Sequence, residues 1–178
     1  MVDPSDRAEF NYSYRVTGEE LLGSSGRVRR ARLLTSGIDK TGLYFLQDGT
    51  LTHQLFIEAA ETFLAGQFIS SAIVAFSFIE RMIAGRLHHL GMKNVARLRS
   101  EVLFQLALKH GWLSLDEHQS LEDLRKFRNP IVHFRDPLDQ SRPEIQAILS
   151  AKNTNQHLEA QAERVMKAAI HVLNYTAL

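Results

Sequence analysis

An arginine and a histidine in the second half of the chain have the side chains that phosphodiester chemistry needs. They are Arg128 and His133, at the two ends of the segment RNPIVH. Histidine suits proton transfer because its unperturbed pKa lies near neutrality. Arginine suits a phosphate because its guanidinium stays charged and can bond two oxygens at once. The pair could therefore support cleavage of RNA through its own 2′-hydroxyl, which needs proton transfer and positive charge at the phosphorane.

Asn129 follows the arginine directly and could donate a hydrogen bond to phosphate or orient His133. The residue types alone also allow a purely structural interpretation. In that interpretation Arg128 is a surface arginine and His133 is a histidine at a helix end.

The context of this segment narrows the choice. The Arg-x4-His pattern lies between two helical patterns and resembles the motif of the HEPN superfamily (higher eukaryote and prokaryote nucleotide-binding domains). The similarity covers about residues 51 to 173, in helix order as well as in motif. Members are small all-α domains, and many are metal-independent ribonucleases whose arginine and histidine lie in a cleft that a second subunit often completes. The resemblance implies catalytic roles for Arg128, Asn129 and His133, a homodimer, and RNA or a nucleotide as ligand.

One position departs from a subgroup of that family. In the subgroup that is paired with a nucleotidyltransferase antitoxin, a tyrosine two residues after the histidine is the modification target. Here that position is Arg135, which argues against control by tyrosine modification and offers another phosphate contact. Pro130 within the motif is also less usual in the family.

Glu80 resembles the acidic residue that some relatives carry on their second helix. It lies at the end of a strongly apolar stretch, and a carboxylate that is buried there requires a partner. Arg81 or Arg86 would be a structural partner, whereas Arg128 or His133 would be a functional one.

A dense basic cluster near the N-terminus gives further candidates for RNA binding. Clusters of this kind are most often a solvated face, and contact with RNA phosphates is the alternative. The candidate RNA-binding residues are Arg27, Arg29, Arg30, Arg32 and Lys126.

The apolar pattern divides the chain into an arm and a bundle. Within residues 1–50, apolar and polar side chains alternate at about residues 10–16, and turn or loop residues follow. This pattern predicts a short β-hairpin or an irregular arm. From Thr50 the apolar residues follow helical spacing instead. The sequence predicts an all-α, HEPN-like up-and-down bundle of four to five helices over residues 51–178.

Within the bundle we expect helices at about 50–65, 68–90, 94–110 and 157–176. A further helix begins after Ser114, since Ser114 and Glu117 form a capping box. We expect it to break at Asn129, because the residue before a proline disfavours the helical conformation. Pro130 would then begin a new helical piece, and residues 136–156 would form loops or short turns.

The composition sets limits on function. The chain has 178 residues, a net charge of +1 and no cysteine, which excludes disulfides and thiolate metal sites. Neither a phosphate-binding loop nor a dinucleotide-binding glycine motif is present. His88 and His89 are adjacent and point to different helix faces, and Glu58 and Glu61 lack a matching histidine. We therefore expect no metal and no cofactor.

The sequence also predicts a cytoplasmic protein that does not cross a membrane. No signal-peptide pattern is present, and the longest apolar run is too short to span a bilayer.

Two functions remain open. The first is a metal-independent endoribonuclease, such as a toxin or a phage-defence effector with an antitoxin or regulatory protein as partner. The second is a non-catalytic module for binding RNA or nucleotides or for protein assembly.

Overall fold

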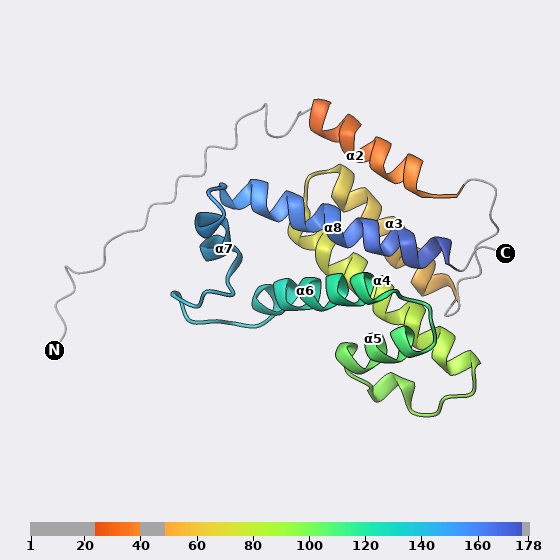
Figure 1. Ribbon diagram of the computed structural model, residues 1–178. Helices are drawn as coiled ribbons and strands as arrows, with labels where there is room; N and C mark the ends of the chain where they lie inside the picture. The colour runs from red at the N-terminus through yellow and green to blue at the C-terminus, as the bar shows by residue number, and fades with distance from the viewer. Residues whose placement is uncertain (1–23, 40–48, 176–178) are drawn as a thin grey trace.

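The computed structural model describes residues 24–39 and 49–175. The described residues form seven α-helices and one 3-10 turn with no strand among them, which confirms the all-α prediction (Figure 1). The elements are α2 (Ser24–Gly37), α3 (Gly49–Leu64), α4 (Phe68–His89), η2 (Val95–Arg97), α5 (Ser100–Lys109), α6 (Leu115–Val132), α7 (Pro143–Leu149) and α8 (Thr154–Asn174).

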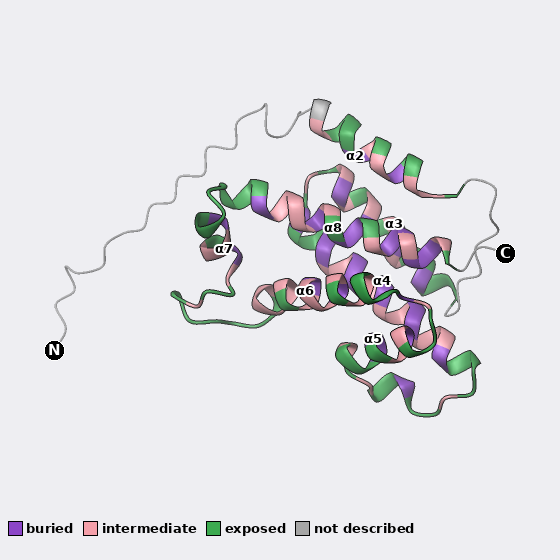
Figure 2. Cartoon of the chain, in the orientation of Figure 1, coloured by how far each residue is buried: buried purple, intermediate pink, exposed green. Residues whose placement is uncertain are grey.

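Helix α4 is the centre of the bundle. It packs most extensively against α3 and α8 and also contacts α5 and α6. Three of its large side chains, Phe76, Phe78 and Ile79, are fully buried. Buried residues are concentrated where α4 passes between its neighbours, whereas the ends of the bundle are exposed (Figure 2). Burial among other helices thus accounts for the apolar character of α4, the one described helix that is long and apolar enough to span a membrane.

Two of the described helices begin with capping boxes. The Ser114 hydroxyl accepts from the backbone N–H of Glu117, as predicted, and the Glu117 carboxylate accepts from the Ser114 backbone. Burial opposes ionisation of Glu117, but the hydrogen bonds from Ser114 and the nearby His171 lower its pKa. Helix α8 starts in the same way with Asn153 as its N-cap. These caps satisfy backbone N–H groups that the first helical turn leaves without partners.

Helix α2 corrects the prediction for the arm. Residues 24–37 are helical, so the hairpin or irregular arm expected for residues 1–50 is wrong there, whereas the strand expected at residues 10–16 lies outside the described residues. The helix has little apolar surface to bury, with Leu34 as its one buried hydrophobic residue. Ion pairs and a few apolar contacts hold it against α3 and α8 instead.

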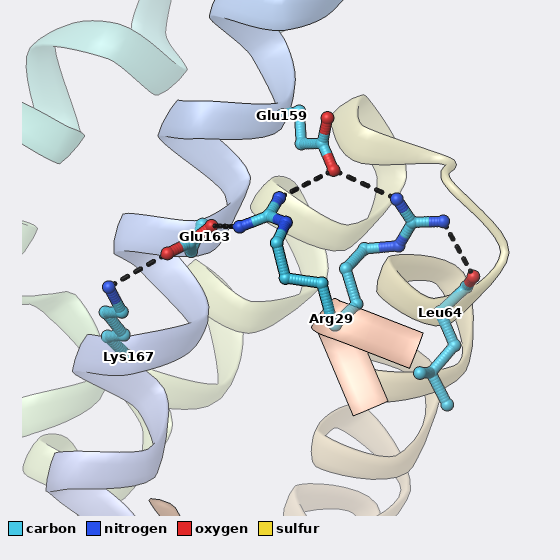
Figure 3. Close-up of polar contacts among 6 residues, drawn as sticks. Arg29, Leu64, Glu159, Glu163 and Lys167 are labelled. Carbon is cyan, nitrogen blue, oxygen red and sulfur yellow. Dashed lines mark hydrogen bonds and ion pairs between the residues drawn. The ribbon is translucent and has the colours of Figure 1, made fainter. Parts of the chain in front are cut away.

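The ion pairs that hold α2 come from two adjacent arginines (Figure 3). Arg29 bonds Glu159 at 2.8 Å and also Glu163, and Arg30 bonds Glu159 at 2.9 Å. Arg30 also donates to the carbonyl of Leu64 at 3.3 Å. The hydrogen bonds from Lys167 and Arg29 lower the pKa of Glu163. Two carboxylates on α8 therefore hold this basic helix in place, although the helix has no strong apolar face.

Two other boundaries differ from the predictions. The helix expected from residue 94 begins instead with the 3-10 turn Val95–Arg97, and α5 starts only at Ser100. The stretch expected to be loop contains α7, which has Pro143 at its first turn and buries Ala147. Proline suits that position because its missing N–H would be unpaired there in any case.

Substitution of Arg30 should destabilise α2 more than substitution of Arg29. The Arg30 side chain is 11% exposed and that of Arg29 is 52% exposed. Arg30→Met should cost about 1.5–3 kcal/mol through lost charge-assisted hydrogen bonds, and Arg29→Met less than about 1 kcal/mol. Hydrogen exchange of the α2 amides and chemical denaturation would measure both. Equal losses of stability in the two variants would show that the burial of Arg30 does not strengthen its contacts.

His157 should make stability depend on pH. Burial lowers the pKa of this histidine, and Lys152 adds to the effect. Below about pH 6.5 the unfolded chain binds a proton at this site that the folded chain resists, so stability should fall as the pH decreases from about 6.5. His157→Gln should flatten the dependence of the unfolding free energy on pH in this range. An unchanged slope would contradict this role for His157.

Candidate functional site

Arg128 lies on an unbroken helix. α6 continues through Pro130 to Val132, so the break predicted at Asn129 is wrong. The proline lies in the last turn of α6, where it removes one backbone donor but leaves few further helical bonds to disturb. The N–H of His133 still donates to the Asn129 carbonyl at 3.0 Å, which closes the helix.

The position of Arg128 on α6 directs its side chain toward the bundle. Leu121 and Leu124 are buried on the same stripe, and Arg128 follows at helical spacing. Its guanidinium carbon lies 5.5 Å from the centre of the Phe76 ring on α4. A cation over an aromatic face is attracted by the negative face of the ring. Phe76 therefore orients Arg128.

Glu80 is the charged neighbour of Arg128. Its Oε2 lies 3.9 Å from Arg128 Nη2, and the two side chains are 22% and 25% exposed. This distance is longer than a hydrogen bond. Arg128 Nε is buried and has no hydrogen-bond partner among the described residues. Arg128 is therefore attracted by the Glu80 carboxylate but does not form a hydrogen bond with it.

The other oxygen of Glu80 is occupied. The Ser100 hydroxyl at the start of α5 donates to Glu80 Oε1. Of the partners considered for Glu80, the structure places the functional candidate Arg128 beside it. Arg86 instead lies against the rings of Trp112 and Tyr175, at 4.3 and 4.8 Å.

His133 ends α6 and is exposed. It is the C-cap with φ −125° and ψ 133°, an extended conformation that any residue adopts. Within the described part of the chain no hydrogen bond joins its ring to Arg128 or to Asn129. The structure therefore brings Arg128 and Glu80 together and leaves the His133 ring and the nearby Arg135 open to solvent.

The predicted RNA-binding residues divide into two groups. Arg29 and Arg30 have carboxylate partners within the chain, whereas Arg27 and Arg32 are exposed on α2. In the part of the chain that the structure describes, α2 packs against α3 and α8 and has no contact with α6. Lys126 is exposed on α6, 3.7 Å from Asp123. The basic cluster is thus separate from the Arg128 site, and Lys126 alone of these residues shares its helix.

Two residues of the site were missed in the sequence. Phe76 lies one helical turn before Glu80, a spacing that places both on one face of α4. That spacing could have identified it. Ser100 lies far from both in sequence, and no local signal connects it with Glu80.

Large exposed apolar side chains occur in the segment after α6 and at the end of α7. Phe134 and Leu138 are 87% and 86% exposed, and Ile148 and Leu149 on α7 are also exposed. Large exposed apolar side chains that lie together often mark an interaction surface.

No group of three or more His, Asp or Glu side chains that could hold a metal occurs among residues 24–39 and 49–175.

No protein-family model, no curated protein and no solved structure matches this chain with statistical significance.

Replacement of Pro130 should stabilise the protein. In Pro130→Ala the new N–H can donate within α6, and the steric conflict of the ring with the preceding turn disappears. We expect a gain of about 1 kcal/mol or more in the free energy of unfolding, because alanine is the better helix former. Pro143→Ala is the matched control, since Pro143 is at the first turn of α7. Pro143→Ala should not stabilise the protein, and an equal gain in both variants would contradict the argument.

Proposed function

We propose that the chain is a metal-independent endoribonuclease of the HEPN type that cleaves single-stranded RNA. One observation supports this most strongly. Arg128 is a half-buried guanidinium that lies over the Phe76 ring, and its Nη2 stays 3.9 Å from Glu80, beyond hydrogen-bond distance. An arginine that is not closed on a carboxylate, five residues before an exposed histidine, suits a site that receives a phosphate.

The chemistry assigns a role to each side chain. The 2′-hydroxyl attacks the adjacent phosphorus, a 2′-oxygen–phosphorus bond forms, and the bond to the 5′-oxygen breaks. A histidine accepts the proton of the 2′-hydroxyl, and a protonated histidine donates one to the leaving 5′-oxygen. Arg128 stabilises the charge on the phosphorane, and Asn129 and Arg135 contact neighbouring phosphates. The products are a 2′,3′-cyclic phosphate and a 5′-hydroxyl.

The geometry of α6 bears on how the two motif residues could act together. Five helical residues rise about 7.5 Å along the axis, which is the axial separation of Arg128 and His133. On an unbroken helix, however, the two positions lie about 140° apart around the axis. A second copy would supply another His133 and allow one histidine to accept a proton while the other donates one. The exposed side chains of Phe134 and Leu138 support a homodimer contact close to His133.

A non-catalytic module for binding RNA or nucleotides or for protein assembly is the second candidate. The exposed apolar side chains after α6 and on α7 favour it, because they fit an assembly surface even without catalysis. Under either proposal the chain acts in the cytoplasm. An antitoxin or regulatory protein is a candidate partner for the apolar surface.

Cleavage of single-stranded RNA in excess EDTA tests the nuclease proposal. The wild type should cleave RNA and leave DNA intact, because DNA lacks the 2′-hydroxyl. His133→Ala should lower kcat by roughly 10²–10⁴-fold through loss of proton transfer. Arg128→Ala should lower it on the order of 10²–10³-fold through loss of charge stabilisation.

The exposed Arg97 on η2 provides a control for charge alone, and Arg97→Ala should leave cleavage unchanged. Mapping of the product ends should give cyclic phosphates. Activity that disappears with EDTA, or that survives both substitutions in the motif, would refute the mechanism. An inactive wild type that binds RNA would favour the second candidate.

A further inference from the structure

Two arginines of α6 face carboxylates in different ways. Arg125 donates to Glu122 through Nε at 3.0 Å and through Nη2 at 2.8 Å, which is a closed pair. This contact raises the pKa of Arg125. Arg128 stays 3.9 Å from Glu80 although its side chain is 25% exposed, close to the 23% of Arg125. Burial therefore does not explain why one pair is closed and the other open.

The two pairs differ in other ways. Arg125 and Glu122 are three residues apart on α6, whereas Arg128 and Glu80 lie on different helices. The two carboxylates are also held differently. In the described chain Glu122 has Arg125 as its hydrogen-bond donor, and its Oε1 is buried without a partner. Glu80 accepts the hydroxyl of Ser100 on its Oε1, which draws the carboxylate toward α5. A hydroxyl hydrogen bond to a carboxylate is among the stronger hydrogen bonds in proteins.

The arginine is held by an aromatic ring. The Phe76 ring lies under the Arg128 guanidinium, one helical turn before Glu80 on α4. α5 packs against α4 and α6, so the start of α5 is fixed relative to both helices. Ser100 and Phe76 thus fix the carboxylate and the guanidinium at a separation that leaves the pair open.

We propose that Ser100 is a positioning residue that keeps Glu80 from closing on Arg128 and thereby keeps Arg128 available for a phosphate. The phosphate is that of RNA if the proposed function holds, and this part of the inference rests on that proposal. A closed pair would have to open before a phosphate could bind, whereas an open pair provides attraction without occupying the donors. The carboxylate still limits the motion of Arg128.

A purely structural role for Ser100 predicts different behaviour. If the hydroxyl only braced α5 against α4, its loss would loosen the region and leave Arg128 freer. Under our proposal its loss closes the ion pair and makes Arg128 more rigid. Removal of the Glu80 charge should then reverse the effect, which a lost structural brace would not allow.

Nitrogen NMR of the arginine side chains in the full chain tests this directly. The rate of rotation about the Nε–Cζ bond of Arg128 reports whether the guanidinium is held by a carboxylate, and Arg125 is the internal reference for a closed pair. Ser100→Ala should slow the rotation of Arg128 on the order of tenfold, the effect of about one hydrogen bond. Ser100→Thr keeps the hydroxyl and should retain the wild-type rate. Glu80→Gln added to Ser100→Ala should restore fast rotation.

Cleavage of single-stranded RNA by the same variants separates this inference from the proposed function. Ser100→Ala should lower kcat/KM on the order of tenfold, and the additional Glu80→Gln should recover most of the loss. Unchanged or faster rotation in Ser100→Ala overturns the role of Ser100, whatever the activity. Slower rotation in a protein whose wild type does not cleave RNA supports the role of Ser100 and refutes the nuclease.

Discussion

The packing of α4 against α3 and α8 is the constraint on which the rest of the structure depends. Small residues let these helices approach, since Ala59, Ala72 and Ala75 are almost completely buried. The buried hydroxyl of Ser71 donates to the Ala59 carbonyl on α3 at 3.1 Å, which satisfies a polar group inside the core. Because α4 is fixed on these faces, the face that meets α5 and α6 presents Phe76 and Glu80 at a defined place.

Four arginines packed on this framework differ in whether their guanidinium groups have partners within the protein. Arg30 holds α2 to α8, and Arg86 lies between two aromatic rings near the end of α8. Arg125 closes on Glu122 within α6. Arg128 differs because its carboxylate is shared with Ser100 and stays beyond hydrogen-bond distance. Of these four arginines, Arg128 alone is half-buried without a closed partner, which makes it the best candidate among them for an external anion.

The sequence predicted features whose cause is local or periodic. The helical spacing identified the buried stripe of α4, and the capping box at Ser114 located the start of α6. Predictions were wrong where a feature depends on residues that are distant in the sequence. The segment that carries the arginines of α2 is helical and is held by Glu159 and Glu163 on α8. These partners are more than a hundred residues away, so the local composition does not indicate the contacts. Pro130 did not end α6, because packing of the helix outweighed the local preference of Asn129.

A crystal structure with a short single-stranded RNA carrying 2′-O-methyl groups would show whether Arg128 binds a phosphate, because the methyl groups prevent cleavage. We expect a phosphate within hydrogen-bond distance of the Arg128 guanidinium, with a His133 ring from one of the copies beside the 2′-oxygen. RNA bound along α2 without a phosphate contact to Arg128 would refute this role.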